Sequence, residues 1–372
     1  MQTGLFTRSA PRAHSKSIWA ALLRVSGILP LAKSWVRRKG TLVLTFHRVL
    51  ADADLQQTAS LSGMVVRQKT FDAFLDYASR KYEFIDLSQD LDWQRGSKIK
   101  LAITFDDGWC DNATIAYPIA CKHQAPMVIF IVAEKIGTTL PFWPERTAAV
   151  LDRRRTSPGM VQSRDYIERT IEDLKGLPAQ ERNQRIGELI SEHLTAQSFP
   201  EVDQTMSWEE VAQLHRGGVT FGSHTSTHEI LTSVPLAQAE EEIAGSRDRI
   251  EKSLGSSCRL FSYPNGDCSQ GVRDLAQQAG YHLAFLNQDP GVWTEKCDPY
   301  LIPRVNVCEF HLVDSTGNFS PLIFDYAVVW NAAKGMFKEI CTNYLLKLRR
   351  QCQGWFARLG PSSDKKHLEK SS

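Results

Sequence analysis

The chain has 372 residues, of which 42% are hydrophobic and 23% are charged, so it can bury a core and is not a disordered chain. The formal net charge of +2 conceals an uneven distribution: residues 1–40 carry eight Lys/Arg and no Asp/Glu, residues 334–370 carry nine Lys/Arg and three Asp/Glu, and the residues between them sum to −12. An acidic body of this kind argues against a nucleic-acid-binding core. Two basic arms suit contact with an anionic surface such as a membrane, and the alternative is that they are solvated helix faces.

The N-terminal arm, residues 1–40, contains one apolar stretch at 18–32, which Arg24, Gly27 and Pro30 interrupt. This stretch is too short and too broken to span a bilayer well, and no small-x-small cleavage site follows it. We therefore predict a basic amphipathic helix that lies on a membrane, in a cytoplasmic protein. An uncleaved signal-anchor is the alternative.

The eight cysteines include no C-x-x-C pair, which argues against a zinc ribbon or a thioredoxin-like site. We expect free thiols in a reducing compartment. Disulfides are the alternative if the protein is exported.

The predicted elements alternate between short strands and longer helices. In chain order, hydrophobic periodicity predicts a strand at 41–50, a helix at 70–80, a short strand at 82–87, a strand at 98–105, a helix at 113–124, a strand at 125–137, a helix at 207–218, a strand and loop at 219–228, a helix at 235–255, a strand and turn at 259–267, and a helix followed by a strand within 269–287. Thr70 is the expected N-cap of the first helix, Ser207 and Glu210 form a capping box, and Gly255 ends the 235–255 helix.

This alternation indicates parallel βα units, arranged either as a barrel or as a doubly wound sheet. We expect the body to cover residues 41–325, with a polar helical insertion at about 141–205 and a basic helical tail at 326–372. In a barrel the carboxyl ends of the strands meet at one face, so polar residues that follow the strands are expected to converge there. These residues are His47, Asp106, Asp107, His224, His228, Pro264, Asn265 and Arg304.

His224 and His228 form an H-x-x-x-H pair, which places two imidazoles on one side of a turn or helix. Two histidines and a carboxylate make a ligand set for a divalent metal with open positions for water, and Asp107 is the carboxylate. Because adjacent carboxylates repel unless a cation neutralises one, Asp107 is predicted to bind the metal and Asp106 to take a proton from water. Without the histidines, Asp106–Gly108 would be interpreted as a turn that closes a strand.

The segments "TFDDG" (104–108) and "SHTSTH" (223–228) together resemble the polysaccharide deacetylase family, the NodB-homology or carbohydrate esterase family 4 enzymes. The resemblance covers roughly residues 41–310, with 141–205 not clearly aligned. It implies a distorted (β/α) barrel of seven or eight strands and metal-dependent hydrolysis of an N- or O-acetyl group on a sugar. It also implies that Asp106 is the catalytic base and that the metal, usually zinc with cobalt or nickel as other candidates, is held by Asp107, His224 and His228.

The family's third motif, Arg-x-Pro followed by an aromatic or small residue, supplies a backbone N–H to the developing oxyanion. Here the corresponding stretch is "FSYPNGD" (261–267), in which Pro264 matches and the N–H of Asn265 is the expected donor. The usual arginine is absent. Arg304 in "LIPRVNV" is expected to replace it beside Asp106, and the alternative is a surface salt bridge.

One branch of the family, the poly-N-acetylglucosamine deacetylase-like proteins, carries an early Tyr/Phe-His-Arg segment whose histidine is the general acid. "LTFHRVL" (44–50) resembles that segment, so His47 is assigned the role of protonating the leaving amine. His311 in "CEFHL" is the alternative acid, and a buried structural histidine is the alternative for His47. Trp143 is expected to be either a core residue or the wall of a sugar-binding groove.

These expectations describe a metal-dependent hydrolase that removes acetyl groups from a polysaccharide or glycan, such as an exopolysaccharide, and releases acetate. Its expected partners are the glycan and a membrane, and no nucleic acid. Two alternatives stay open. The same metal site could act on a non-sugar amide or a cyclic imide, or the chain could be a non-catalytic glycan-binding protein docked on a membrane.

Overall fold

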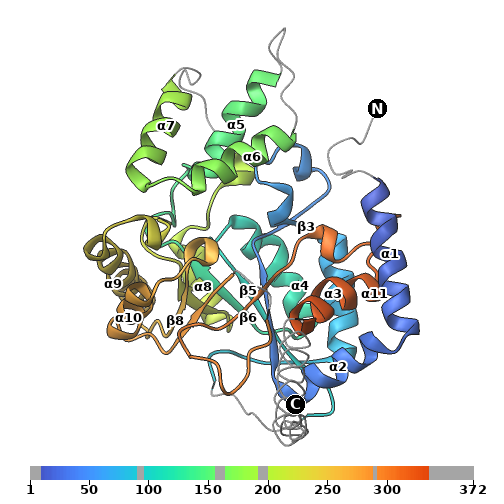
Figure 1. The fold of residues 1–372 in the computed structure, drawn as a ribbon. Helices are drawn as coiled ribbons and strands as arrows, with labels where there is room; N and C mark the ends of the chain where they lie inside the picture. The colour runs from blue at the N-terminus through green and yellow to red at the C-terminus, as the bar shows by residue number, and fades with distance from the viewer. Residues whose placement is uncertain (1–9, 90–95, 156–163, 192–199, 288–290, 335–372) are drawn as a thin grey trace, which may run out of the picture.

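The structure is a computed structural model, which describes residues 10–89, 96–155, 164–191, 200–287 and 291–334. One parallel sheet of eight strands forms its centre (Figure 1). Seven strands follow one another in the order β10 (Val305–Asn306), β1 (Thr41–Phe46), β5 (Ile99–Phe105), β6 (Met127–Ile131), β7 (Thr220–Ser223), β8 (Leu260–Ser262) and β9 (Leu283–Phe285). The eighth strand, β4 (Tyr82–Phe84), pairs with the first half of β5.

The sheet curls until its two edges share one segment. At one edge, the backbone N–H of Ile302 donates to the carbonyl oxygen of Ala284 in β9. The N–H of Leu286, just after β9, donates to the carbonyl oxygen of Ile302. At the other edge, Val305 and Asn306 pair with β1. Residues 302–306 therefore join the two edges, and the predicted distorted (β/α) barrel is confirmed.

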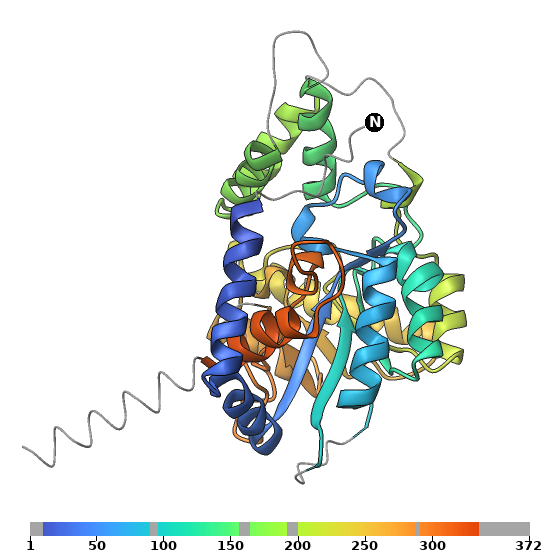
Figure 2. The same ribbon diagram turned by 90° about the vertical axis from the view of Figure 1, so that its right-hand side faces the viewer.

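Helices cover the outside of this sheet (Figure 2). They are α1 (Ala10–Val25), α2 (Ile28–Lys39), α3 (Gln68–Lys81), α4 (Tyr117–Lys122), α8 (Trp208–Arg216), α9 (Leu236–Leu254), α10 (Gln270–Gln278) and α11 (Pro321–Phe324). Strands β1 and β6 are buried along their whole length, which is why they appear in the sequence as continuous apolar runs and not as alternating ones.

Of the three helix-end features predicted from the sequence, two are confirmed and one is wrong. The capping box of Ser207 and Glu210 is present at the start of α8, and Gly255 ends α9 with a left-handed φ of 64°. The predicted N-cap role of Thr70 is wrong, because α3 begins at Gln68 and the Thr70 hydroxyl instead donates to Glu309, 2.8 Å away. The Thr70 hydroxyl therefore bonds to a carboxylate far away in the sequence and does not cap the helix.

The strand predicted at 41–50 is divided in two. After β1 ends at Phe46, β2 (Arg48–Leu50) leaves the barrel and pairs in parallel with β3 (Val65–Arg67). His47 lies at the division between the two strands.

The described parts of residues 141–205 form helices, as expected, and these helices lie together at one end of the molecule (Figure 1). The helices are α5 (Trp143–Arg155), α6 (Arg164–Lys175) and α7 (Ala179–Ser191). Ala148, Leu151, Ile167 and Ile171 form a small apolar core of their own between α5 and α6, and Trp143 packs against it, which agrees with its interpretation as a core residue.

The N-terminal residues form two helices along one side of the barrel (Figure 2). Leu29, Ala32 and Val36 of α2 are buried in the main core, so this helix is part of the folded body. Among the described residues, no helix has the length and apolarity required to cross a membrane. The predicted tail helix beyond Lys334 lies outside the described residues. The six described cysteines form no disulfide.

Candidate active site

The adjacent carboxylates at the end of β5 point to different partners. Asp107 has a left-handed φ of 76°, which is uncommon for a residue other than glycine and turns the chain sharply after the strand. Gly108 follows with a φ of 77°, and a Cβ there would lie 2.9 Å from the side chain of Ile131. The turn therefore requires a glycine and separates the two carboxylates.

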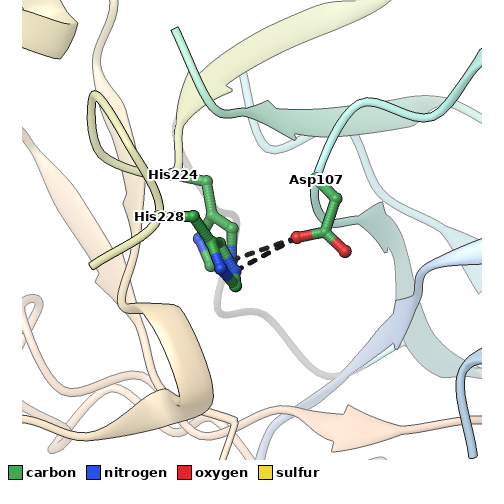
Figure 3. Close-up of side chains that lie close together, drawn as sticks. All are labelled: Asp107, His224 and His228. Atoms are coloured by element: carbon green, nitrogen blue, oxygen red, sulfur yellow. Dashed lines mark ion pairs between the residues drawn. The ribbon is translucent and has the colours of Figure 1, made fainter. Parts of the chain in front are cut away.

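Asp107 faces two imidazoles (Figure 3). Its Oδ1 lies 3.3 Å from Nε2 of His228 and 3.7 Å from Nε2 of His224. One ligand atom from each of the three residues lies within 4.8 Å of the others. The spacing along the chain had predicted that these residues share a site, and the fold brings them together.

The donor set fits a divalent cation. Oδ2 of Asp107 accepts a hydrogen bond of 3.0 Å from Nε1 of Trp109, whereas Oδ1 is buried and accepts none. Burial would raise the pKa of Asp107, but His228, whose Nε2 lies 3.3 Å from Oδ1, and the charge of His47 hold that pKa well below its usual range. An ionised oxygen without a donor, aimed at two imidazole nitrogens, is the arrangement that a metal ligand requires.

His224 is held in the tautomer that suits a ligand. Its Nδ1 lies 2.8 Å from the carbonyl oxygen of Ser262 and donates to it, so Nε2 is left with a free lone pair toward Asp107. Burial lowers the pKa of His224 to about 4, which keeps the imidazole neutral at physiological pH. The loop between the two histidines is fixed by Glu242, which accepts hydrogen bonds from the backbone N–H groups of Ser226 and Thr227.

Asp106 is paired with Arg304. Two guanidinium nitrogens lie 2.8 and 2.7 Å from its two oxygens, and both side chains are almost fully buried. Burial would raise the pKa of Asp106, but the charge of Arg304 and the hydrogen bonds from it more than offset this effect, and the pKa of Asp106 is lowered. Arg304 comes from the segment that closes the barrel, and it also donates to the hydroxyl of Ser262 at 2.7 Å. The alternative of a surface salt bridge for Arg304 is wrong.

His47 follows β1 at the same end of the barrel. It is close enough to both aspartates for its charge to lower the pKa of each. Its Nδ1 is buried and has no hydrogen-bond partner, and its carbonyl oxygen accepts a hydrogen bond of 2.9 Å from Asn112. His311, by contrast, contacts Cys308 and Phe310 of its own short 3-10 turn.

Asn265 lies in a 3-10 turn, Pro264–Gly266, directly after β8. Its backbone is left-handed, with a φ of 58°, and its exposed side chain donates to Asp267 at 2.6 Å. Any contribution of Asn265 to the site is therefore through its backbone.

The insertion supplies residues that sequence analysis did not assign to the site. Phe142 packs edge-on against Trp109 and His228, with ring centroids 5.0 and 5.1 Å apart. Glu145 is buried, and burial together with the charges of Asp107 and Asp203 raises its pKa to about 8. These residues stand in a polar, helical segment without a recognisable motif, so only the fold reveals their proximity to the site.

A buried ion pair also joins the insertion to the histidine loop. Arg182 of α7 bonds to Glu229, the residue after His228, and its guanidinium lies 5.5 Å from the ring of Trp143. The insertion is thus anchored to the loop that carries His228. Trp143 lies between this arginine and the insertion core, which favours its interpretation as a core residue over that as the wall of a sugar-binding groove.

The fold and the site define a barrel with a two-histidine, one-carboxylate centre at the carboxyl ends of its strands. The family model described as polysaccharide deacetylase matches residues 94–284, which is just over half of the chain. The chain therefore belongs to the polysaccharide deacetylase family.

Individual relatives are distant. YxkH of Bacillus subtilis, a provisionally named polysaccharide deacetylase, is 22% identical over 221 residues, 59% of this chain and 55% of that protein, so the chain spans about half the length of this curated relative. The crystal structure of a polysaccharide deacetylase from Bacillus cereus matches with a TM-score of 0.50 and 16% identity over 75% of this chain and 67% of that chain. IcaB from Ammonifex degensii matches with a TM-score of 0.49 and 17% identity over 78% of this chain and 97% of that chain. At these identities the Bacillus cereus structure supports the fold alone.

Proposed function

We propose that this chain is a metal-dependent deacetylase that removes N-acetyl groups, or O-acetyl groups, from a polysaccharide or glycan and releases acetate. The observation that carries this proposal is the placement of Asp107, His224 and His228 around one point, with the ionised Asp106 beside them. Membership of the family supports the same reaction class. The proposed catalytic body is residues 41–325.

The proposed metal ligands are Oδ1 of Asp107 and Nε2 of each histidine, a set that suits zinc, with cobalt and nickel as alternatives. A divalent ion at this point supplies Lewis acidity, which lowers the pKa of water toward neutrality. Neutral His224 and ionised Asp107 offer lone pairs without first losing a proton.

Asp106 is the proposed general base. Its carboxylate takes a proton from the attacking water as the new C–O bond forms, which requires that it be ionised beforehand. Arg304 meets this requirement because its bidentate contact stabilises the charged form. The same contact fixes the orientation of the carboxylate, so Arg304 is a positioning residue.

The remaining proposed roles concern the oxyanion and the leaving group. The backbone N–H of Asn265 is the proposed donor to the negative oxygen that develops on the acetyl carbonyl. His47 is the proposed general acid, which donates a proton to the departing amine, because an amine anion is too basic to leave. Its early position in the chain matches the poly-N-acetylglucosamine deacetylase-like branch.

A direct test is an acetate-release assay on the purified full chain, before and after removal of metal with a chelator and after addition of Zn²⁺, Co²⁺ or Ni²⁺. We expect release from an N-acetylated amino-sugar polymer that depends on the added metal and is lost in Asp107→Asn. Turnover of a small amide or a cyclic imide without turnover of the polymer would instead support the first alternative. Binding of the polymer without any acetate release would support the non-catalytic alternative.

We also propose that the protein is cytoplasmic and docks on an anionic membrane through α1 and α2. Ile18, Trp19, Leu22, Val25 and Leu31 are all more than half exposed, with Val25 at 87%. The basic residues Arg24, Arg37, Arg38 and Lys39 are exposed on the same helices, and residues 1–40 contain no acidic residue. Apolar and basic side chains together favour a helix that lies at a lipid surface.

Vesicle sedimentation tests this docking. We expect the chain to sediment with vesicles that contain anionic lipid and less with zwitterionic vesicles, and Trp19→Ser with Leu22→Ser to reduce binding. Leu236→Ser is the matched control, because Leu236 is 55% exposed but lies on α9. Equal binding by the double variant and the wild type contradicts the proposal, and a dimer in solution that the double variant dissolves would assign the face to a second copy.

A further inference from the structure

A second buried cluster of charges lies beside the candidate metal site. It consists of Arg48, Asp111 and Asp203, with Trp109 against the guanidinium, and is called here the Arg48 cluster. Arg48 is fully buried and lies 2.9 Å from Asp111 and 2.5 Å from Asp203. Burial of three charges is costly and adds little stability relative to apolar packing, so such a cluster raises the question of what it positions.

The cluster and the neighbouring Asn112 hold the backbone at His47 and just after it. Asp111 Oδ1 accepts a hydrogen bond of 2.7 Å from the N–H of Val49, two residues after His47. Asn112 donates to the carbonyl oxygen of His47 at 2.9 Å. The segment that follows the aspartate pair therefore fixes the division between β1 and β2, and with it the direction of the His47 side chain.

The cluster also fixes the orientation of Asp107. The guanidinium carbon of Arg48 lies 4.3 Å from the ring centroid of Trp109, and Phe142 packs edge-on against the same ring at 5.0 Å. Held by these contacts, Trp109 presents its Nε1–H to Oδ2 of Asp107 at 3.0 Å. Because Oδ2 is occupied, Oδ1 remains directed at His224 and His228.

We propose that Arg48 and Trp109 are positioning residues of the reaction: Arg48 fixes His47 through the backbone that Asp111 and Asn112 hold, and Trp109 fixes the metal-binding oxygen of Asp107. Asp203, at the end of the insertion, completes the ion cluster, so the insertion contributes to the same alignment. This inference rests on the function proposed above. Neither side chain is expected to touch the substrate.

Trp109→Phe tests the second half of the proposal. Phenylalanine keeps an aromatic ring beside Arg48 but removes the hydrogen bond to Asp107. Loss of such a partner of a metal ligand typically weakens metal binding about 10–100-fold. We expect a loss of this size in the Zn²⁺ dissociation constant, measured by competition with a chromogenic chelator. Trp293→Phe is the matched control, because Trp293 is also buried but lies near the start of β1, and no effect on the Zn²⁺ dissociation constant is expected there.

The outcomes of this titration are distinguishable. If the wild type binds one Zn²⁺, Asp107→Asn binds none, and Trp109→Phe binds as tightly as the wild type, the positioning role is wrong while the proposed function stands. If the wild type itself binds no Zn²⁺, the proposed function fails. A 10–100-fold weaker affinity in Trp109→Phe alone supports the inference.

Arg48→Lys tests the first half. Lysine keeps the positive charge but lacks the planar fork that contacts both aspartates. We expect kcat to fall about 10–100-fold with KM changed less than about threefold, on the scale of other losses of a positioning partner. Because Arg48 acts through His47, Arg48→Lys should lower kcat only slightly further when His47 has already been replaced by Ala. An equal loss in both backgrounds overturns the proposal.

If Arg48→Lys does not fold, Asn112→Ala replaces it in the same cycle. That variant removes the hydrogen bond to the His47 carbonyl and leaves the ion pairs of Arg48 intact. The same criterion applies: a loss that depends on His47 supports the inference, and one that does not overturns it.

Discussion

The two ends of the barrel bury different kinds of side chain. At the carboxyl ends of the strands, Asp106, Asp107, His224 and Arg304 are all no more than 3% exposed and are paired with one another. Toward the amino ends, a cavity of about 530 Å³ is lined by buried apolar residues such as Phe221, Leu260 and Trp293, and its charged lining residues, Arg259 and Glu295, are exposed.

We therefore expect the carboxyl end of the barrel to determine turnover and the amino end to determine the free energy of unfolding. Buried charges are tolerated only where each has a partner, and their removal is expected to change turnover. Apolar packing at the opposite end contributes to the free energy of unfolding. Substitutions at the two ends should therefore affect different measured quantities.

The largest effect is expected at the carboxyl end, for Asp106→Asn. Asparagine cannot accept the proton from water, and the charge of Arg304 is left buried without its partner, so kcat should fall about 10³–10⁴-fold. Zn²⁺ affinity measured by chelator competition should change little, because Asp106 is not a proposed ligand. Residual activity above one tenth of the wild-type kcat would show that another group is the base.

His47→Ala should have the next largest effect, with kcat lower by about 10²–10³-fold for an N-acetylated substrate. His311→Ala should change kcat less than about threefold, because His311 contacts its own turn. Steady-state acetate release compares the two variants. The reverse order would transfer the role of general acid to His311.

Glu145→Gln should change how stability depends on pH. The pKa of Glu145 is raised to about 8 in the folded chain from an ordinary value of 4.5. The stability that its protonated form contributes is therefore complete below about pH 4.5 and is lost as pH rises through about 8. Glutamine cannot ionise, so near pH 9 the metal-free variant should be more stable than the wild type by about 2–4 kcal/mol, with little difference near pH 4.5.

Denaturant unfolding of the metal-free proteins at both pH values measures this difference. Glu240→Gln serves as a control, since Glu240 is exposed on α9. A constant difference between Glu145→Gln and the wild type at both pH values would mean that Glu145 is ionised in the folded chain.

The smallest effect on turnover is expected at the amino end. Leu260→Ala should lower the free energy of unfolding by about 2 kcal/mol through lost packing next to the cavity. The kcat of the folded protein should stay within about twofold of the wild type. A tenfold fall in kcat would show that the two ends are coupled, and the comparison would no longer hold.

Local chemistry in the sequence was sufficient for part of this description. Alternating strands and helices predicted a barrel, and "TFDDG" with "SHTSTH" predicted which three side chains would meet, because residues at the carboxyl ends of parallel strands share one face. The capping box at Ser207 and the end of α9 at Gly255 were also predictable. Each of these features depends on residues that are close along the chain or on a rule that holds for the whole fold.

The tertiary structure alone decided the rest. The sequence placed Arg304 either beside Asp106 or in a surface salt bridge, and closure of the barrel through residues 302–306 decided for Asp106. Thr70 leaves its helix end because Glu309 reaches it. Glu145 and Phe142 approach the site because the insertion folds back onto the histidine loop. These contacts join residues far apart in sequence, and their energies come from burial and charge pairing in the closed barrel, which no local pattern of residues encodes.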